Sequence, residues 1–521
     1  MVLCLNCSAE VAIQSISTFI ITAMILSSDY QTFRNSTGTS CLVPVYRTVI
    51  SDLDTPLTIF AKIGNDEENI FLFESMEGGE KWGRYSFIGF EPLLKFSSID
   101  SNISIEFFDG SLLRKTEEVG DPLQRLKKVL HDFRVAENDN LPRFCGGAVG
   151  FLGYDMVRFM EELPDNREKL DFPDSSFIVP RIVLVHDNFK QTVTVVCWVP
   201  CDKESESEIL YDQATARIDS VIDMLRTPVP ASFHSSSARG SNTKHAFTSN
   251  MDQDSFHLMV ERALEYIKAG DIIQVVLSQK FHTKTDLDPL VLYRALRHIN
   301  PSPYLFYLKL GKLIQIGSSP EILVRKEGNI IELRPIAGTR KRGSTKEEDE
   351  ALEKELLADP KETAEHLMLV DLGRNDVGRI ARDGTVDVTD LLVVERYSHV
   401  MHIVSGVKGI IADDKDQFDV MRACFPAGTV SGAPKIRAME IIDELEPGKR
   451  GPYAGAVGYF GFSGNMDFCI TIRTFVMQDD NLWIQAGAGL VYDSDPQTEY
   501  EETINKSMGL RRAVELAQKG F

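Results

Sequence analysis

A glutamate on the apolar side of an expected helix is the first residue whose position indicates chemistry. The segment 362–380 has helical spacing: Leu369 and Leu372 follow Glu365 by four and seven residues, and no glycine or proline interrupts it before Gly373. A carboxylate on such a face is costly to bury unless it meets a cation or a proton partner. The alternative is a surface glutamate at the edge of the polar face, so a ligand role for Glu365 needs a second acidic group nearby.

The closing helix expected at 496–518 supplies further carboxylates. Glu499, Glu502 and Lys506 are spaced three and four residues apart, so they share one helix face. Alone, this pattern is typical of a solvated surface. Together with Glu365 it offers the carboxylate oxygens that Mg²⁺ prefers, with water and substrate oxygens completing the octahedral shell. The sequence therefore predicts a Mg²⁺ site that presents the ion to an anionic ligand.

Other residues could hold such an anion directly. Arg473 is expected in the middle of a strand at 467–476, where a buried arginine needs a carboxylate partner, although an exposed arginine on an edge strand fits equally well. Gly487 and Gly489 leave backbone N–H groups open to a carboxylate. His402 lies among apolar residues, which alone indicates a hydrogen-bonded core histidine.

Two loops have the glycine, serine and threonine content of anion-binding segments. They are PIAGTR (335–340) and GTVSGAPK (428–435). The second lacks the Walker spacing, so ATP is not indicated, and no GxGxxG follows a strand to open a helix in the dinucleotide-binding manner.

The composition is that of an acidic globular protein. The 521 residues carry a net charge of −21, with 43% hydrophobic and 26% charged residues. This charge argues against nucleic acid or an anionic membrane as the main partner, whereas a small anionic substrate needs only a locally positive pocket. Eight scattered cysteines fit a reducing compartment, so the cytoplasm is the expected location.

The periodicity of apolar residues divides the chain at a linker. Residues 227–250 have the Pro, Ser, Gly and Asn content of a linker. They separate an N-terminal domain at 42–226 from a catalytic domain at 251–521. Strands and helices mix without regular βαβ alternation, which predicts an α+β fold. The main expected strands are 43–50, 69–75, 83–90, 103–108, 145–155, 177–187, 191–200, 271–281, 453–462, 467–476 and 481–492, and the expected helices are 121–134, 203–226, 496–518 and one that Asp254 caps and Gly270 ends.

Residues 1–41 are expected to be an N-terminal extension outside the fold. The apolar run 11–27 is short for a membrane span, and no Lys or Arg precedes Arg34, so the positive region of a secretory signal is missing. Met24 is a candidate for the true start.

Seven segments together resemble one enzyme family. PIAGTR, EHLMLVDLGRND, RYSHVMHIVSG, PAGTVSGAPKIRAMEII, YAGAVGYF, CITIRT and QAGAGLVYDSDP closely resemble, in this order, the chorismate-binding domain of anthranilate synthase component I. The resemblance extends over residues 42–518 and implies two intertwined β-sheet layers packed face to face, with helices outside. It also implies a Mg²⁺-dependent enzyme of tryptophan synthesis. Such an enzyme adds ammonia at C2 of chorismate with loss of the 4-hydroxyl and then eliminates pyruvate to give anthranilate.

The resemblance implies a role for each matching residue. Glu365 and Glu502 would be the Mg²⁺ ligands. Glu321 would be the general acid for the departing hydroxyl, and it must stay protonated, which a partly dry pocket favours. His402 would face the ring and the enolpyruvyl group, and Gln274 and Thr429 belong to the catalytic set. Chorismate would be held by Gly338, Thr339, Tyr453, Arg473, Gly487, Ala488, Gly489 and Lys506.

Two positions distinguish this chain from relatives with other products. Isochorismate- and salicylate-forming relatives have a lysine base at the position of Gln274, and an amide cannot deprotonate water, so ammonia is the expected nucleophile. Aminodeoxychorismate synthase resembles PIKGT where this chain has Ala337, which favours addition at C2 over C4. Component I of that synthase stays the alternative among enzymes, and a non-catalytic tryptophan-binding paralogue is the alternative from another class.

The resemblance also implies feedback inhibition by L-tryptophan. The segments 73–75 and 300–304 resemble the feedback pocket, and Lys81 or Arg84 is expected to complete it. The pocket residues implied are Glu74, Ser75, Pro303, Tyr304, Leu305 and Cys469.

No glutaminase activity is expected from this chain. None of its cysteines lies in a Gly-x-Cys-x-Gly elbow, so no nucleophilic cysteine is available for amide hydrolysis. A separate glutamine amidotransferase subunit, component II, is therefore the expected source of ammonia, which predicts a hetero-oligomer.

Overall fold

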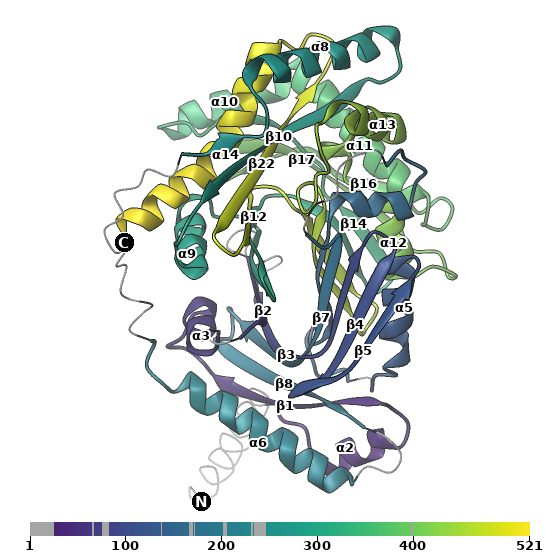
Figure 1. Cartoon of the computed structure of the whole chain (residues 1–521), viewed down its shortest axis with the longest axis vertical. Coiled ribbons are helices and arrows are strands. Elements are labelled where there is room, and N and C mark those ends of the chain that lie inside the picture. Colours follow the sequence, from purple (N-terminus) through teal and green to yellow (C-terminus); the bar gives the residue numbers. More distant parts are fainter. Residues whose placement is uncertain are drawn as a thin grey trace, which may run out of the picture.

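Long antiparallel strands form the centre of the molecule. The structure is a computed structural model that describes residues 26–64, 67–75, 83–136, 138–165, 170, 172–201, 206–230, 233, 246–397 and 400–521. Within these residues, 22 strands are joined by pairing into one connected set. Helices α3, α9 and α14 lie along one side of the strands and α5, α11 and α12 along the other (Figure 1).

The connected strands form two sheets that share β3 and β7. In the first sheet the order is β1 (Leu42–Ile50), β8 (Thr192–Pro200), β7 (Ser175–Asp187), β3 (Tyr85–Ile99), β2 (Asn69–Glu74), β11 (Tyr304–Leu310), β12 (Leu313–Ser319), β21 (Thr474–Gln478), β22 (Asn481–Leu490) and β10 (Gln274–Lys284), with β9 (Thr248–Ser249) and β18 (Gly432–Ala433) also on β10.

In the second sheet the shared strands have other neighbours: β3 pairs with β4, and β7 pairs with β6. Its order is β5 (Ser111–Val119), β4 (Asn102–Asp109), β3, β7, β6 (Gly147–Leu152), β19 (Ala456–Gly461), β20 (Met466–Ile470), β13 (Ile322–Glu327), β14 (Ile330–Leu333) and β17 (Val400–Ile410), with β15 (Ile336–Lys341) and β16 (Asp387–Arg396) also on β17.

The shared strands pass from one sheet to the other because β3 is irregular in its middle. Glu91 has a φ of 54°, and the register with β7 shifts between Pro92 and Leu94. A bulge of this kind bends a strand and increases its twist. The first half of β3 therefore pairs with β2 and the second half with β4. The α+β class with intertwined β layers, as expected from the sequence, is confirmed.

Side-chain alternation places a core on each face of the first sheet. On β2 and β11, Phe71 and Phe306 belong to a core cluster that also contains Phe151 and Phe468 of the second sheet. Their neighbours Leu72 and Leu305 belong instead to a second cluster under α3, α9 and α14. Successive residues of a strand point to opposite faces, and both segments are nearly continuous apolar runs, as strands buried on both faces are.

The helices cover the outer faces, and their bounds agree well with the periodic segments. They are α2 (Tyr30–Thr37), α3 (Pro56–Ile63), α5 (Pro122–Asp132), α6 (Ser207–Leu225), α8 (Gln253–Ala269), α9 (Pro289–Ile299), α10 (Lys346–Ala358), α11 (Pro360–Gly378), α12 (Gln417–Cys424), α13 (Lys435–Leu445) and α14 (Pro496–Lys519), with 3₁₀ turns η1 (Tyr154–Phe159) and η2 (Gly428–Val430). No helix in the described part of the chain is both long and apolar enough to cross a membrane.

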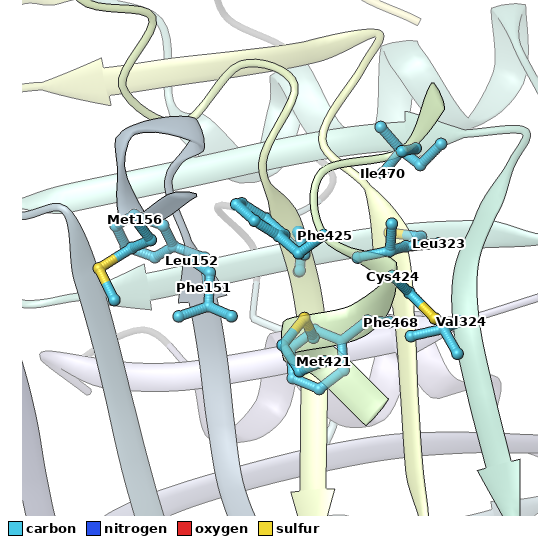
Figure 2. Close-up of a cluster of buried hydrophobic side chains, with 14 of the residues drawn as sticks. Phe151, Leu152, Met156, Leu323, Val324, Met421, Cys424, Phe425, Phe468 and Ile470 are labelled. Atoms are coloured by element: carbon cyan, nitrogen blue, oxygen red, sulfur yellow. The ribbon is translucent and has the colours of Figure 1, made fainter. Parts of the chain in front are cut away.

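A buried cluster joins elements from both halves of the sequence. Phe151 and Leu152 of β6 lie near Met421 and Phe425 of the α12 region, with Phe468 of β20 beside them (Figure 2). The pairings β2–β11 and β6–β19 likewise join a strand that precedes residues 227–250 to a strand that follows them. The two sequence halves therefore share both sheets and one core. Of the expected linker itself, 231–232 and 234–245 lie outside the described residues.

The expectation that all of residues 1–41 lie outside the fold is wrong for its second part. Phe33 of α2 is buried, and its ring lies 5.5 Å from that of Tyr211 on α6. Ser27 also forms a β-bridge with Arg47 of β1. The amphipathic spacing in 30–37 extends over only two turns, so this packing has little signal in the sequence. Residues 1–25 and Met24 lie outside the described residues.

Candidate active site

A cavity of about 640 Å³ lies where β10, β22, β15, β17, α11 and α14 meet. Every residue expected in the catalytic, substrate-binding or metal site lines it, except Ala488, which is buried in β22. The residues brought together are Gln274, Glu321, Gly338, Thr339, Glu365, His402, Thr429, Tyr453, Arg473, Gly487, Gly489, Glu502 and Lys506.

Carboxylates from α11 and α14 face each other across this cavity. Glu362, Glu365, Glu499 and Glu502 all line it. Burial raises the pKa of the Glu365 carboxyl, and the negative charges of Glu362 and Glu502 raise it further, while a hydrogen bond from Gln274 acts in the opposite direction. That bond joins Gln274 Nε2 to Glu365 Oε1 at 2.9 Å. The repulsion among these groups indicates a place for a cation.

Glu499 strengthens this conclusion. It is buried, its Oε2 atom has no hydrogen-bond partner among the described residues, and burial raises the pKa of its carboxyl. An orphaned buried carboxylate oxygen is costly unless a ligand completes it.

The carboxylates fit Mg²⁺ better than a metal that needs a full protein ligand set. In the described residues, no three His, Cys, Asp or Glu side chains converge closely enough to hold a metal by themselves. Mg²⁺ usually takes one or two carboxylates and fills its octahedron with water and substrate oxygens. A pair of glutamates at an open cavity is suited to that ion.

Lysine and glycine form the adjoining wall on α14 and β22. Lys506 Nζ lies 2.6 Å from Glu502 Oε1 and donates to the Gly487 carbonyl oxygen at 3.0 Å. A Cβ atom at Gly487 would lie 2.7 Å from the Tyr453 hydroxyl, and one at Gly489 would lie 3.1 Å from Gln274 Nε2. Glycine at 487 therefore allows the backbone of β22 to approach Tyr453, whereas a side chain at 489 would need Gln274 to shift by a few tenths of an ångström.

Glu321 is the most strongly perturbed acid in the cavity. It follows β12, and its side chain is buried beside Thr429 and Arg473. Burial raises the pKa of Glu321 from 4.5 to about 8, although the Thr429 hydroxyl and the Arg473 guanidinium act in the opposite direction. The carboxyl group is therefore mainly protonated at neutral pH and can donate a proton.

The sequence predicted that Arg473 lies in the middle of a strand, and this prediction is wrong. The expected strand 467–476 is broken into β20 and β21, which lie in different sheets. Arg473 lies in the break with a φ of 49°, in the left-handed region that non-glycine residues seldom adopt. The break turns the chain between the sheets and directs this cation to the cavity. Strain of this kind is typical of functional sites.

His402 is held in one tautomer. Its Nδ1 lies 3.0 Å from the Gly338 carbonyl oxygen and 3.0 Å from Thr339 Oγ1. Because a carbonyl oxygen can only accept, Nδ1 must carry the proton and Nε2 is left as an acceptor. Burial lowers the pKa of His402, so the neutral ring is favoured.

Several polar residues of the cavity lining were missed in the sequence, among them Glu362 and Gln485. Glu362 precedes Glu365 by three residues on α11, and Gln485 precedes Gly487 by two residues on β22, so both face the same side as their neighbours. Helical and strand periodicity could have found both, because each repeats the face of a residue already chosen.

A second, smaller cavity contains all six residues expected in the feedback pocket. Its volume is about 60 Å³. Arg84, one of the two cations expected to complete it, is not in its lining: the guanidinium binds Asp187 at 2.8 Å instead. Arg143 and Arg325 supply positive charge there among the described residues. Lys81 lies outside the described residues. The residues of the pocket that were expected are Glu74, Ser75, Pro303, Tyr304, Leu305 and Cys469.

Comparison with known proteins identifies the class that this fold and cavity define. Residues 69–512 match the family described as chorismate binding enzyme, and the chain belongs to that family. Within it, the chain groups with the anthranilate synthase component I proteins, as the sequence motifs predicted.

The similarity to these proteins extends over nearly their whole length. Anthranilate synthase component 1 of Acetivibrio thermocellus is 49% identical over 479 residues, which cover 91% of this chain and 96% of that protein. The protein of the same name from Acinetobacter calcoaceticus is 47% identical over 491 residues, covering 92% and 96%. The crystal structure of anthranilate synthase component I from Streptococcus pneumoniae matches with a TM-score of 0.71 at 38% identity, covering 84% of this chain and 95% of that one.

Proposed function

We propose that this chain is the catalytic subunit of anthranilate synthase and converts chorismate and ammonia to anthranilate and pyruvate. The observation that carries the proposal is Glu321, a buried acid whose pKa of about 8 keeps it protonated in a cavity that also contains Arg473 and Lys506. Relatives that this chain covers to 96% of their length are named anthranilate synthase component 1. The proposal places the chain at the first committed step of tryptophan synthesis.

The cavity residues can bind both carboxylates of chorismate and assist the loss of its 4-hydroxyl. Arg473, Lys506 and the backbone of β22 bind carboxylate oxygens. His402 lines the cavity as a neutral ring, so it would contact the substrate without adding charge. Glu321 donates its proton to the 4-hydroxyl oxygen as the C4–O bond breaks, so that the group leaves as water while ammonia forms the new bond at C2. Elimination of the enolpyruvyl group as pyruvate then gives the aromatic product.

Glu365 and Glu502 would hold Mg²⁺, with Glu499 close by. When bound, the ion supplies Lewis-acid neutralisation of the ring carboxylate. The chain's own contribution is to keep two acidic side chains on α11 and α14 at one side of the cavity.

Ammonia is the nucleophile that fits the wall at β10. Gln274 is buried, its amide nitrogen is used by Glu365, and its Oε1 atom has no hydrogen-bond partner. This oxygen can accept an N–H of ammonia but cannot remove a proton from water. Because no cysteine of the chain lies in a glutaminase elbow, ammonia would come from a separate amidotransferase subunit.

Ala337 also lines the cavity, so no lysine reaches the substrate from that position. This favours addition at C2 over the aminodeoxychorismate alternative. The set of cavity carboxylates argues against a non-catalytic tryptophan-binding role, because a binder of tryptophan has no need for them.

L-tryptophan is proposed to inhibit the enzyme from the smaller cavity. Asp467 in this cavity accepts two hydrogen bonds from Arg325 and one from Tyr304. The charge of Arg325 is therefore already paired with that of Asp467. Glu74 lies 3.2 Å from Arg297, while Arg143 makes a longer contact of 3.4 Å with Glu327. Arg143 is therefore the cation better placed to exchange its partner for an amino-acid carboxylate.

Strand β20 offers a short route from the smaller cavity to the active site. Cys469 lines the smaller cavity and is paired with Ile322, and the next residue, Ile470, donates its N–H to the Glu321 carbonyl oxygen at 3.1 Å. Arg473 follows three residues later. Displacement of β20 by a ligand would therefore shift both the general acid and a substrate-binding cation.

The direct test is product formation by the purified chain. Chorismate, Mg²⁺ and an ammonium salt at raised pH should give the fluorescence of anthranilate together with one equivalent of pyruvate. Glutamine in place of ammonium should give no product. A 4-amino product that retains the enolpyruvyl group, or turnover with glutamine alone, would contradict the proposal.

A further inference from the structure

A buried ion pair lies directly behind one wall of the active-site cavity. Arg450 binds Glu446 through Nη2 at 2.6 Å and Nε at 2.9 Å, and the two side chains are 1% and 4% exposed. Burying such a pair costs desolvation that its mutual attraction seldom exceeds, so stability alone does not account for it. Its other contacts indicate what it positions.

Arg450 fixes two backbone positions of the cavity wall. Its guanidinium donates to the carbonyl oxygens of Val276 at 2.6 Å and Val430 at 2.7 Å, and both residues line the cavity. Val430 follows Thr429, which lies beside Glu321. The pair therefore joins β10 to the η2 turn at the general acid.

Glu446 begins a relay of hydrogen bonds that ends at Gln485. Glu446 Oε1 accepts from the backbone N and from the Oγ of Ser278, each at 2.8 Å. Beside Arg450 the carboxylate is ionised and can only accept, so Ser278 must spend its single hydroxyl proton on it. Ser278 Oγ can then only accept from Gln485, and the Gln485 Nε2 atom lies 2.9 Å away.

This chain of donors determines which way the Gln485 amide points. Gln485 lines the cavity, whereas Ser278, Glu446 and Arg450 are not part of its lining; Gln485 and Arg450 also line a neighbouring cavity of about 20 Å³. One N–H of the amide is used by Ser278, which fixes the orientation of the amide, and the carbonyl oxygen is the acceptor that the side chain offers. A charge outside the cavity thereby sets the polarity of a group inside it.

We propose that Gln485 contacts the substrates as a hydrogen-bond acceptor, and that Glu446, Arg450 and Ser278 are positioning residues that fix its orientation. This inference rests on the proposed function and adds a residue that the sequence motifs did not assign. The group that Gln485 accepts from has an N–H or O–H, either of ammonia or of the chorismate hydroxyl, and steady-state kinetics separate the two.

The test compares Gln485→Met with a matched control, Gln315→Met. Gln315 is a buried strand glutamine of the same sheet that lines neither cavity, and neither polar atom of its amide has a hydrogen-bond partner. Loss of the acceptor in Gln485→Met should raise the KM of one substrate roughly 3- to 10-fold. A rise in the ammonia KM assigns the donor to ammonia, and a rise in the chorismate KM assigns it to the hydroxyl. Gln315→Met should leave both KM values and kcat as in the wild type.

Ser278→Ala separates positioning from packing. It keeps the Gln485 amide but removes the group that orients it, so the same KM should rise, by a smaller factor, with the thermal midpoint near that of the wild type. Wild-type kinetics in Gln485→Met, or a lowered midpoint without a KM change in Ser278→Ala, would overturn the inference while the proposed function stands. Absence of anthranilate formation by the wild type would instead overturn the proposed function, and this inference with it.

Discussion

At the scale of single residues, the cavity is a place where burial and charge act on acids in opposite ways. Glu321 is buried beside a hydroxyl and a guanidinium, and burial has the larger effect, so its pKa is raised to about 8. His402 is buried too, but for an imidazole burial lowers the pKa. Near pH 7 the acid therefore holds its proton and the histidine is neutral, which is the combination that acid-assisted loss of a hydroxyl requires.

This difference predicts the pH dependence of the chemical step. Glu321 is active when protonated, so kcat should be level below pH 8 and fall about tenfold per pH unit well above it. The measurement is kcat at saturating chorismate, with the free ammonia concentration held constant across the pH range. Glu321→Gln should lose roughly 10²- to 10⁴-fold in kcat and show no such fall. A wild-type profile that stays level to pH 10 would remove Glu321 from the role of general acid.

At the scale of elements, the sequence predicted the type of the segments it assigned, but it assigned no helix or strand within 282–361 or 381–452, where the structure has α9, α10, α12, α13 and β11 to β17. The apolar run in 69–75 and the helical spacing in 362–380 correspond to β2 and α11: β2 is buried on both faces, and α11 buries one stripe of residues. The expected strand 467–476 is divided at 471–473, because which sheet each half joins depends on distant partners, β13 and β12. Local pattern contains no information about those partners.

Local signals also left details of the elements open. Asp252 caps α8 through the Ser255 N–H, whereas the sequence pointed to Asp254, two residues on in the same acidic segment. Strand β5 was not expected, since its residues are mostly exposed and charged. The cavity residues on α11 and α14 could be predicted because helix geometry fixes their spacing. Arg143 could not, because a loop residue has no periodicity that relates it to the smaller cavity.

The break at Arg473 predicts that stability and activity separate. Arg473→Gly removes the cost of a side chain at a φ of 49°, whereas Arg473→Ala retains it. Both variants should lose activity at least roughly 100-fold in kcat/KM, because the substrate carboxylate loses the guanidinium that pairs with it in the cavity. The glycine variant should nevertheless be about 1 kcal/mol more stable than the alanine variant in denaturant unfolding. Equal stability of the two variants would show that the backbone at this position is not strained.

At the scale of the whole molecule, two sheets that share β3 and β7 bring the N-terminal segment 69–75 next to β11 of the other half. The smaller cavity forms at that junction, and β20 leads from it to the active site. Regulation of the proposed kind follows from the way the halves are interleaved, since neither half contains the whole pocket.

Ser75 tests whether tryptophan acts through this pocket. Ser75→Leu adds volume to a wall of a cavity of only 60 Å³ and should weaken inhibition by L-tryptophan at least roughly tenfold. Because Ser75 does not line the active-site cavity, kcat and the chorismate KM should stay within twofold of the wild type. Inhibition curves measured at fixed chorismate give the comparison, and an unchanged half-inhibitory concentration would place the effector elsewhere.

The central claim is that α11 and α14 hold one divalent ion over the substrate through Glu365 and Glu502. Its most direct test is the Mg²⁺ concentration that gives half-maximal anthranilate formation after EDTA treatment, in Glu365→Gln, Glu502→Gln and the control Glu501→Gln. Glu501 is the exposed neighbour of Glu502 and bonds only to Gln497 among the contacts found for its carboxylate in the described residues. We expect both site variants to need at least roughly tenfold more Mg²⁺ and to lose most of kcat, while Glu501→Gln behaves as the wild type. Full activity of either site variant at the wild-type Mg²⁺ requirement, or full wild-type activity in EDTA, would contradict the account.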